Sequence, residues 1–165
     1  ATPLFGICEA WWGQATTEQA MTPEERDRIE AACIRLQRRY GTLADRQDPA
    51  FRELFTPNAK IELPYYPPFS GIDAIMAGQA EWRASGIVMR HVCTNFVIDV
   101  VDAEHAKGIC YLMVFRHEPL AKPSAEAQPS LPLSLGEFHD TFIKSGGRWL
   151  FERRKLVPVF RGFAS

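Results

Sequence analysis

The stretch that decides the fold is MRHVCTNFVIDVVDAEHAKGICYLMVFRH, residues 89–117. Residues 89–101 and 107–117 are two runs rich in β-branched and aromatic side chains, and the polar segment Asp102-Ala103-Glu104 lies between them. Two such runs joined by a short polar segment are typical of antiparallel strands connected by a turn. We therefore expect a β-hairpin here.

Two more strands are expected after this hairpin. Residues 135–144 and 149–160 are again rich in apolar side chains, and Ser145-Gly146-Gly147 between them is typical of a tight hairpin turn. All four runs are apolar on both faces, which indicates burial on both sides. We expect helices to cover one face of the sheet and a second subunit to cover the other.

The N-terminal half has helical periodicity instead. Thr22-Pro23-Glu24-Glu25 predicts a helix start with a capping box, and apolar residues recur at helical spacing as far as Tyr40. Further helix starts are expected at Asp48-Pro49 and near residue 71, where Ser70 and Asp73 would supply the cap. Helices followed by an antiparallel meander predict an α+β fold.

Composition limits the class of protein. The chain has 165 residues and a formal net charge of −1, which favours one domain and argues against a nucleic-acid partner. No apolar run is long enough to span a membrane. The four cysteines have no paired spacing, and no signal-peptide pattern opens the chain, so we expect free thiols in a cytoplasmic protein.

Two segments stand apart from the expected core. Residues 1–21 are expected to form an N-terminal arm whose Trp11-Trp12 pair packs on the core or on a subunit interface. A single domain would cover residues 22–165, and its proline-rich residues 119–134 would form a long loop between strands.

His91 is the first candidate for proton transfer. Strand alternation would place it on one face with Met89, Cys93, Asn95 and Val97. That mixture of apolar and polar groups is typical of a pocket lining, and an imidazole moves protons near neutral pH. A structural role stays open. We expect no metal, because no further nitrogen or sulfur ligands converge with His91 and Cys93.

Tyr40 and Asp45 are further candidates. Tyr40 ends an apolar helical face, so it is either a core residue or a buried phenol that polarises a carbonyl. Asp45 lies five residues on, about 140° around an ideal helix at ~100° per residue. The two would be neighbours only if the helix ended between them, which Gly41 would permit. A turn role for Asp45 stays open.

Asp140 is expected to be buried and paired. Phe138 and Phe142 flank it on one strand face, and a carboxylate in such surroundings needs a partner. Arg116, on the preceding expected strand, is the available cation. The later basic cluster, which includes Arg154, is interpreted as solvent-exposed because strand faces alternate.

In their order along residues 22–160, several motifs resemble the SnoaL-like branch of the NTF2-like superfamily. They are Tyr40-x4-Asp45, Leu54-Phe55-Thr56-Pro57-Asn58-Ala59, Gly71-Ile72-Asp73-Ala74-Ile75, Arg90-His91-Val92-Cys93-Thr94-Asn95, Val114-Phe115-Arg116, Phe138-His139-Asp140 and Gly146-Gly147-Arg148-Trp149. That group includes scytalone dehydratase, bile-acid 7α-dehydratase, ketosteroid isomerase and polyketide cyclases. The resemblance implies a cone-shaped barrel, a bent antiparallel sheet wrapped around about three helices. It also implies an apolar pocket at the open end and a homodimer through the outer sheet face.

The resemblance also implies a site and a chemistry. His91, Tyr40 and Asp45 would converge on one cavity and act, without a cofactor, as a dehydratase or isomerase on a small hydrophobic ring-bearing hydroxy or carbonyl compound. The residues expected to bind substrate are Tyr65, Phe69, Trp82, Met89, Asn95, Val114, Arg116, Phe138 and Asp140.

The chain also departs from its relatives at several positions. Thr42 stands at a position where scytalone dehydratase has an aspartate, and Arg116 and Val114 stand near further acid–base positions of the relatives. A non-catalytic binding module, or a small subunit of a ring-hydroxylating oxygenase, therefore stays open as an alternative.

Overall fold

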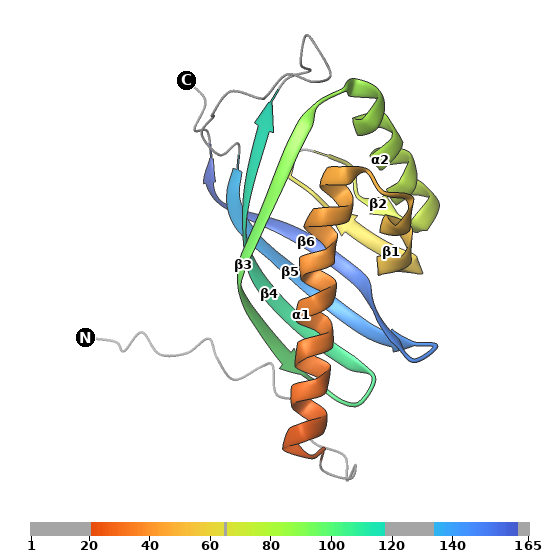
Figure 1. Cartoon of the computed structure of the whole chain (residues 1–165), viewed down its shortest axis with the longest axis vertical. Coiled ribbons are helices and arrows are strands. Elements are labelled where there is room, and N and C mark those ends of the chain that lie inside the picture. The colour runs from red at the N-terminus through yellow and green to blue at the C-terminus, as the bar shows by residue number, and fades with distance from the viewer. Residues whose placement is uncertain (1–20, 65, 118–133, 162–165) are drawn as a thin grey trace, which may run out of the picture.

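The computed structural model describes residues 21–64, 66–117 and 134–161, and Figure 1 shows their arrangement. The elements in chain order are α1 (Pro23–Arg46), the 3-10 helix η1 (Pro49–Leu54), β1 (Phe55–Glu62), β2 (Phe69–Ser70), α2 (Ile72–Ser85), β3 (Val88–Val100), β4 (His105–His117), β5 (Ser134–Ser145) and β6 (Arg148–Arg161). The expected arm, Tyr65 and the expected loop at 119–134 lie outside the described residues, apart from Met21 and Ser134.

The strands form one open sheet in the order β2-β1-β6-β5-β4-β3. Figure 1 shows α1 lying across one face of this sheet, with α2 beside β1 and β2. The α+β prediction is confirmed. The sheet is mixed rather than purely antiparallel, because β1 pairs in parallel with β6. Strand periodicity alone did not predict β1.

Local chemistry sets most element ends. At the start of α1, the Thr22 hydroxyl accepts from the Glu25 amide at 3.2 Å while the Glu25 carboxylate accepts from the Thr22 amide at 2.9 Å, the predicted capping box. Asp48 caps η1 as expected. The cap expected for α2 is wrong: Gly71, at φ 85°, takes that position without a side-chain bond, because Ser70 belongs to β2.

The hairpin between β5 and β6 turns where expected. Gly146 and Gly147 have φ of 56° and 76°, which a type I′ turn requires and glycine adopts without strain. Ser145 pairs with Arg148 across it. This turn aligns β5 and β6, which carry the buried ion pair between Asp140 and Arg154.

The core lies between α1, η1 and the covered face of the sheet. Its fully buried side chains include Cys33, Phe51, Leu54, Cys110, Leu112, Phe138, Phe142 and Phe151. The described cysteines, Cys33, Cys93 and Cys110, are free thiols as predicted. Of the helices in the described part of the chain, none is both long and apolar enough to cross a membrane.

Candidate functional site

A histidine–aspartate pair joins β3 to the last turn of α1. The His91 Nδ1 and Asp45 Oδ1 atoms are 2.6 Å apart, and the His91 amide donates to Asp45 Oδ2 at 3.0 Å. The side chains are only 11% and 9% exposed. Because one carboxylate holds both the main chain and the ring of His91, the imidazole is fixed in orientation. In its neutral form it carries the proton on Nδ1 and leaves Nε2 as the acceptor.

Helix α1 does not end at Gly41, so that expectation is wrong. The helix runs on to Arg46, and Gly41 is buried where α1 crosses β3. A Cβ on Gly41 would lie 3.1 Å from the His91 carbonyl oxygen and 3.3 Å from its Cβ. Glycine therefore allows the close approach, and Asp45, one turn on and on the same helix face, reaches His91.

Tyr40, the residue before Gly41 in α1, also contacts His91. Its side chain is 3% exposed, and its ring meets the His91 ring edge-on with centroids 6.0 Å apart. Burial raises the pKa of Tyr40 to about 12, against the opposing charge of Arg154. The phenol is therefore protonated at neutral pH. Its hydroxyl makes no hydrogen bond to the described residues, so it is a donor without a protein acceptor there.

A fully buried ion pair between Arg154 and Asp140 packs against the Tyr40 ring. Arg154 donates from Nε to Asp140 Oδ1 at 2.8 Å and from Nη2 to Oδ2 at 2.6 Å, and Gln37 Nε2 donates to Oδ2 at 2.8 Å. The Arg154 Cζ lies 4.1 Å from the Tyr40 ring centroid and about as close to two phenylalanine rings. Burial alone would lower the pKa of Arg154, but the charge and hydrogen bonds of Asp140 raise it, so the guanidinium stays charged.

Two expectations about this pair are wrong. Asp140 is buried and paired as predicted, but its partner is Arg154 and not Arg116. Asp140 lies opposite Gly108 of β4, and Arg116 is eight residues further along that strand, roughly 27 Å at ~3.4 Å per residue. Arg154, in turn, is not solvent-exposed, because it lies directly opposite Asp140 on the covered face.

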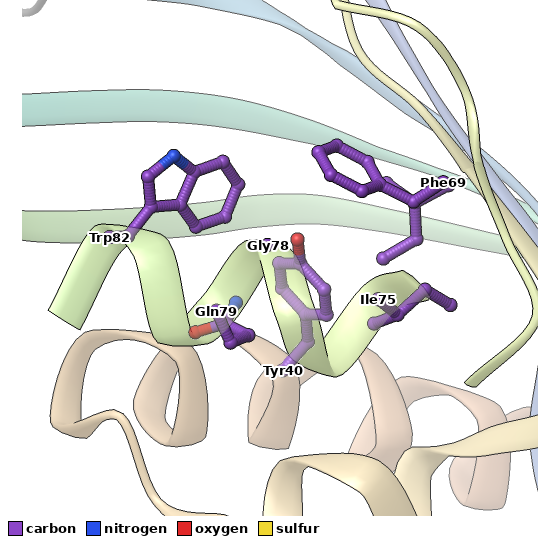
Figure 2. Close-up of a pocket in the computed structure, with 7 residues that line it drawn as sticks. Tyr40, Phe69, Ile75, Gly78, Gln79 and Trp82 are labelled. Atoms are coloured by element: carbon purple, nitrogen blue, oxygen red, sulfur yellow. The ribbon is translucent and has the colours of Figure 1, made fainter. Parts of the chain in front are cut away.

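A small pocket among the described residues lies between α1, α2 and the β1–β2 edge. It is lined by Tyr40, Ile61, Phe69, Ile75, Gly78, Gln79 and Trp82. Figure 2 shows the Tyr40 hydroxyl pointing toward the space between Phe69 and Trp82. The cavity volume of about 10 Å³ leaves room for roughly one water molecule. Asp45 and His91 do not line it, so Tyr40 links the pocket to the histidine–aspartate pair.

The face expected for β3 is right only for its first half. Asn95 and Phe96 together lie opposite Cys110, and this β-bulge reverses the alternation. Asn95, at φ 51°, is exposed, and Val97 is 66% exposed. The expectation that Asn95 shares the His91 face is therefore wrong.

The other expected binding residues are spread along the covered face. Phe69 and Trp82 line the pocket, and Val114 is buried directly opposite His91. Phe138 packs on Arg154, while Met89 and Arg116 are half-buried cross-strand partners.

The sequence analysis did not single out Gln37 or Gln79, and it assigned other roles to Gly41 and Arg154. Pairing residues outward from the Gly146-Gly147 turn places a basic residue of the last strand opposite Asp140, so the sequence does indicate a basic partner there. The count gives Arg153, however, because a β-bulge after Thr141 shifts the register by one residue. Gln37 and Gln79 each lie within an apolar stripe of a helix, and this pattern is the sequence feature that indicates a buried polar side chain.

Comparisons with known proteins identify a family and several solved structures of similar fold. Residues 26–155 match the sequence profile of the SnoaL-like domain. The fold resembles a candidate scytalone dehydratase from Novosphingobium aromaticivorans, with a TM-score of 0.72, 20% identity and coverage of 84% of this chain and 89% of that chain. It also resembles a candidate NTF2-like dehydratase from Streptomyces avermitilis, with a TM-score of 0.70, 17% identity and coverage of 81% and 98%.

A protein of unknown function from Mycobacterium tuberculosis is similar as well, with a TM-score of 0.66, 25% identity and coverage of 85% of this chain and 78% of that chain. Among curated proteins, no sequence matches significantly. The family match spans most of the chain and the solved structures share its fold. The shared fold is the expected NTF2-like one. The chain belongs to the SnoaL-like domain family.

Proposed function

We propose that the protein is a cofactor-independent dehydratase or isomerase that acts on a small hydrophobic compound with a ring and a hydroxyl or carbonyl group. The observation that carries this proposal is the buried Asp45–His91 pair in contact with Tyr40, whose free hydroxyl reaches an aromatic-lined pocket. The two candidate dehydratases of similar fold support the reaction class.

Each group has a distinct role in the proposed reaction. His91 Nε2 removes a proton from a carbon next to the substrate carbonyl, and the protonated Tyr40 donates a hydrogen bond to the oxyanion that develops. Asp45 stabilises the imidazolium that forms. In a dehydration the imidazolium returns its proton to the departing hydroxyl, which leaves as water. In an isomerisation the proton goes to another carbon of the substrate.

The position of His91 sets a requirement on the bound substrate. Because the imidazole meets the Tyr40 ring edge-on and lies outside the pocket lining, the reacting carbon must lie on the His91 side of Tyr40. The carbonyl oxygen would then face the Tyr40 hydroxyl. None of the described residues that line the pocket is charged, which favours an uncharged substrate.

A substrate screen tests the proposal. Hydroxylated aromatic, polyketide-like and steroid-like compounds are incubated with the protein, and the products are weighed by mass spectrometry. Loss of one water means dehydration, and a changed spectrum at unchanged mass means isomerisation. The His91→Ala variant should fold and lose turnover by about 10²–10⁴-fold. A folded His91→Ala variant with full activity would refute the proposed role of His91.

A non-catalytic binding module is the second candidate. The absence of Asp45 and His91 from the pocket lining favours it. This alternative predicts that ring compounds bind with equal affinity to the native protein and to His91→Ala, and that no product forms from any of them.

We also propose a homodimer through the outer face of β3 and β4. Val92, Val97, Ile109 and Tyr111 expose large apolar side chains there. Such a patch is typical of an interface. Light scattering should give twice the chain mass, and Val97→Glu should yield a folded monomer. A native monomer at high micromolar concentration would contradict this proposal.

A further inference from the structure

Gln79 is a second buried polar side chain in the pocket, and the proposed reaction gives it no role. It lies on α2, is 8% exposed and lines the same cavity as Tyr40. Its amide makes no hydrogen bond to the described residues. Tyr40 and Gln79 are the two polar side chains among the seven lining residues, and Figure 2 shows them with their aromatic and aliphatic neighbours.

The amide of Gln79 is open to the cavity. No hydrogen bond joins it to a described residue, and its atoms are not among the fully enclosed polar atoms that lack a partner. The cavity has room for roughly one water, a molecule that is able to bond both side chains. The phenol of Tyr40 offers a donor, and the amide of Gln79 offers a donor and an acceptor. Both groups are thus available to a ligand that replaces the water.

The walls of the pocket favour a flat ring as that ligand. A Cβ at Gly78 would lie 2.7 Å from the Phe69 ring, so this ring rests directly on the α2 backbone beside Gln79. Trp82 meets Phe69 edge-on, with centroids 6.2 Å apart. Both aromatic side chains are half-buried. Binding of a ring requires them to move apart, because the cavity has room for roughly one water.

We propose that Gln79 determines specificity by binding a second oxygen substituent of the ligand, while Tyr40 binds its carbonyl. The ligand class is an uncharged, flat ring compound that carries a carbonyl and a hydroxyl group. This inference rests on the proposed function in that it takes the Tyr40 hydroxyl as the carbonyl-binding group of the same pocket.

Binding of simple probes tests the role of Gln79. Benzaldehyde and the three hydroxybenzaldehyde isomers are titrated into the full-length protein and followed by calorimetry. At least one hydroxybenzaldehyde should bind about 2- to 12-fold more tightly than benzaldehyde, as one neutral hydrogen bond of ~0.5–1.5 kcal/mol provides. Gln79→Leu should remove this preference, so that the variant binds the hydroxybenzaldehydes and benzaldehyde with equal affinity. Tyr40→Phe should weaken all the aldehydes and keep the preference.

Two controls make the test decisive. Glu81→Gln, on the exposed side of the same helix, should change nothing. In the unmodified protein, labelled with nitrogen-15, the preferred probe should shift the side-chain amide signals of Gln79 more than benzaldehyde does, which gives a result even if Gln79→Leu does not fold. Absence of any probe binding, unshifted Gln79 signals, or a preference that survives Gln79→Leu would overturn the inference.

The outcomes also separate this inference from the proposed function. If turnover is found but the Gln79 preference is absent, the inference fails and the acid–base proposal stands. If the preference holds but no compound is turned over, the acid–base proposal fails and Gln79 remains a specificity residue of a binding module.

Discussion

Removal of Arg154 should cost more stability than removal of any exposed arginine. Arg154→Met keeps an aliphatic side chain of similar length but leaves the Asp140 carboxylate fully buried with Gln37 as its remaining partner. Breaking a buried ion pair from one side costs about 3–5 kcal/mol. The guanidinium contacts with the Tyr40 ring and two phenylalanine rings are lost as well. We therefore expect the free energy of unfolding to fall by about 3–5 kcal/mol.

The neighbouring Arg153 provides a matched control. It pairs with Glu62 at 2.5 Å, but its side chain is 47% exposed, and exposed ion pairs contribute about 0–1 kcal/mol. Arg153→Met should therefore be nearly neutral. Urea unfolding followed by circular dichroism measures both variants, with the slope m checked for constancy.

A double variant separates charge pairing from packing. Arg154→Met with Asp140→Leu removes both charges, so it should be more stable than Arg154→Met alone, although Gln37 then lacks an acceptor. The reasoning is refuted if Arg154→Met loses less than about 1 kcal/mol, or if the effects of Arg154→Met and Asp140→Leu simply add in a double-mutant cycle.

Three further predictions concern the groups around His91. Asp45→Asn keeps the size of the side chain but removes its charge, so turnover of a substrate found by the screen should fall about 10²–10⁴-fold. The low-field NMR signal of the His91 Nδ1 proton should also vanish, and a persisting signal would contradict the assigned bond. In Gly41→Ala the added Cβ presses on the backbone and Cβ of His91, so turnover should fall, by less than the ~10²-fold that a 1 Å misplacement costs. The higher helix propensity of alanine should offset the accompanying loss of stability by up to ~1 kcal/mol. An unchanged kcat at an unchanged melting temperature would refute the positioning role of Gly41. Burial raises the pKa of Tyr40 to about 12, so the unfolded state releases the phenol proton first as pH rises above ~10. The stability of the native protein relative to Tyr40→Phe should therefore fall by about 1.4 kcal/mol per pH unit between pH ~10 and ~12. Urea unfolding at several pH values measures this difference, and a constant difference would mean that the phenol titrates normally.

Features that depend on a few neighbouring residues followed from the sequence alone. The capping box at Thr22, the Asp48 cap and the glycine turn after Ser145 each arise from bonds or φ values within about four residues. The burial of alternate residues around Asp140 also followed, because strand periodicity alone determines it. The α+β class came from the order of these local elements.

The arrangement of the site needed the tertiary structure. The β3 bulge turns Asn95 outward, and the β5 bulge places Arg154 rather than Arg153 opposite Asp140. A one-residue shift reverses which side chains face the core, and it is decided by how both faces pack, not by the strand sequence.

The residues that meet at His91 show the same division. Sequence periodicity placed Tyr40 and Asp45 on different sides of one helix and could join them only by ending that helix at Gly41. In the folded protein the helix continues, and a strand about fifty residues later lies against Gly41 closely enough for His91 to contact both. The sequence by itself determined which chemical groups are present and which elements carry them. The tertiary structure decided which of them meet, because the close approach of α1 and β3 depends on packing between segments far apart in the chain.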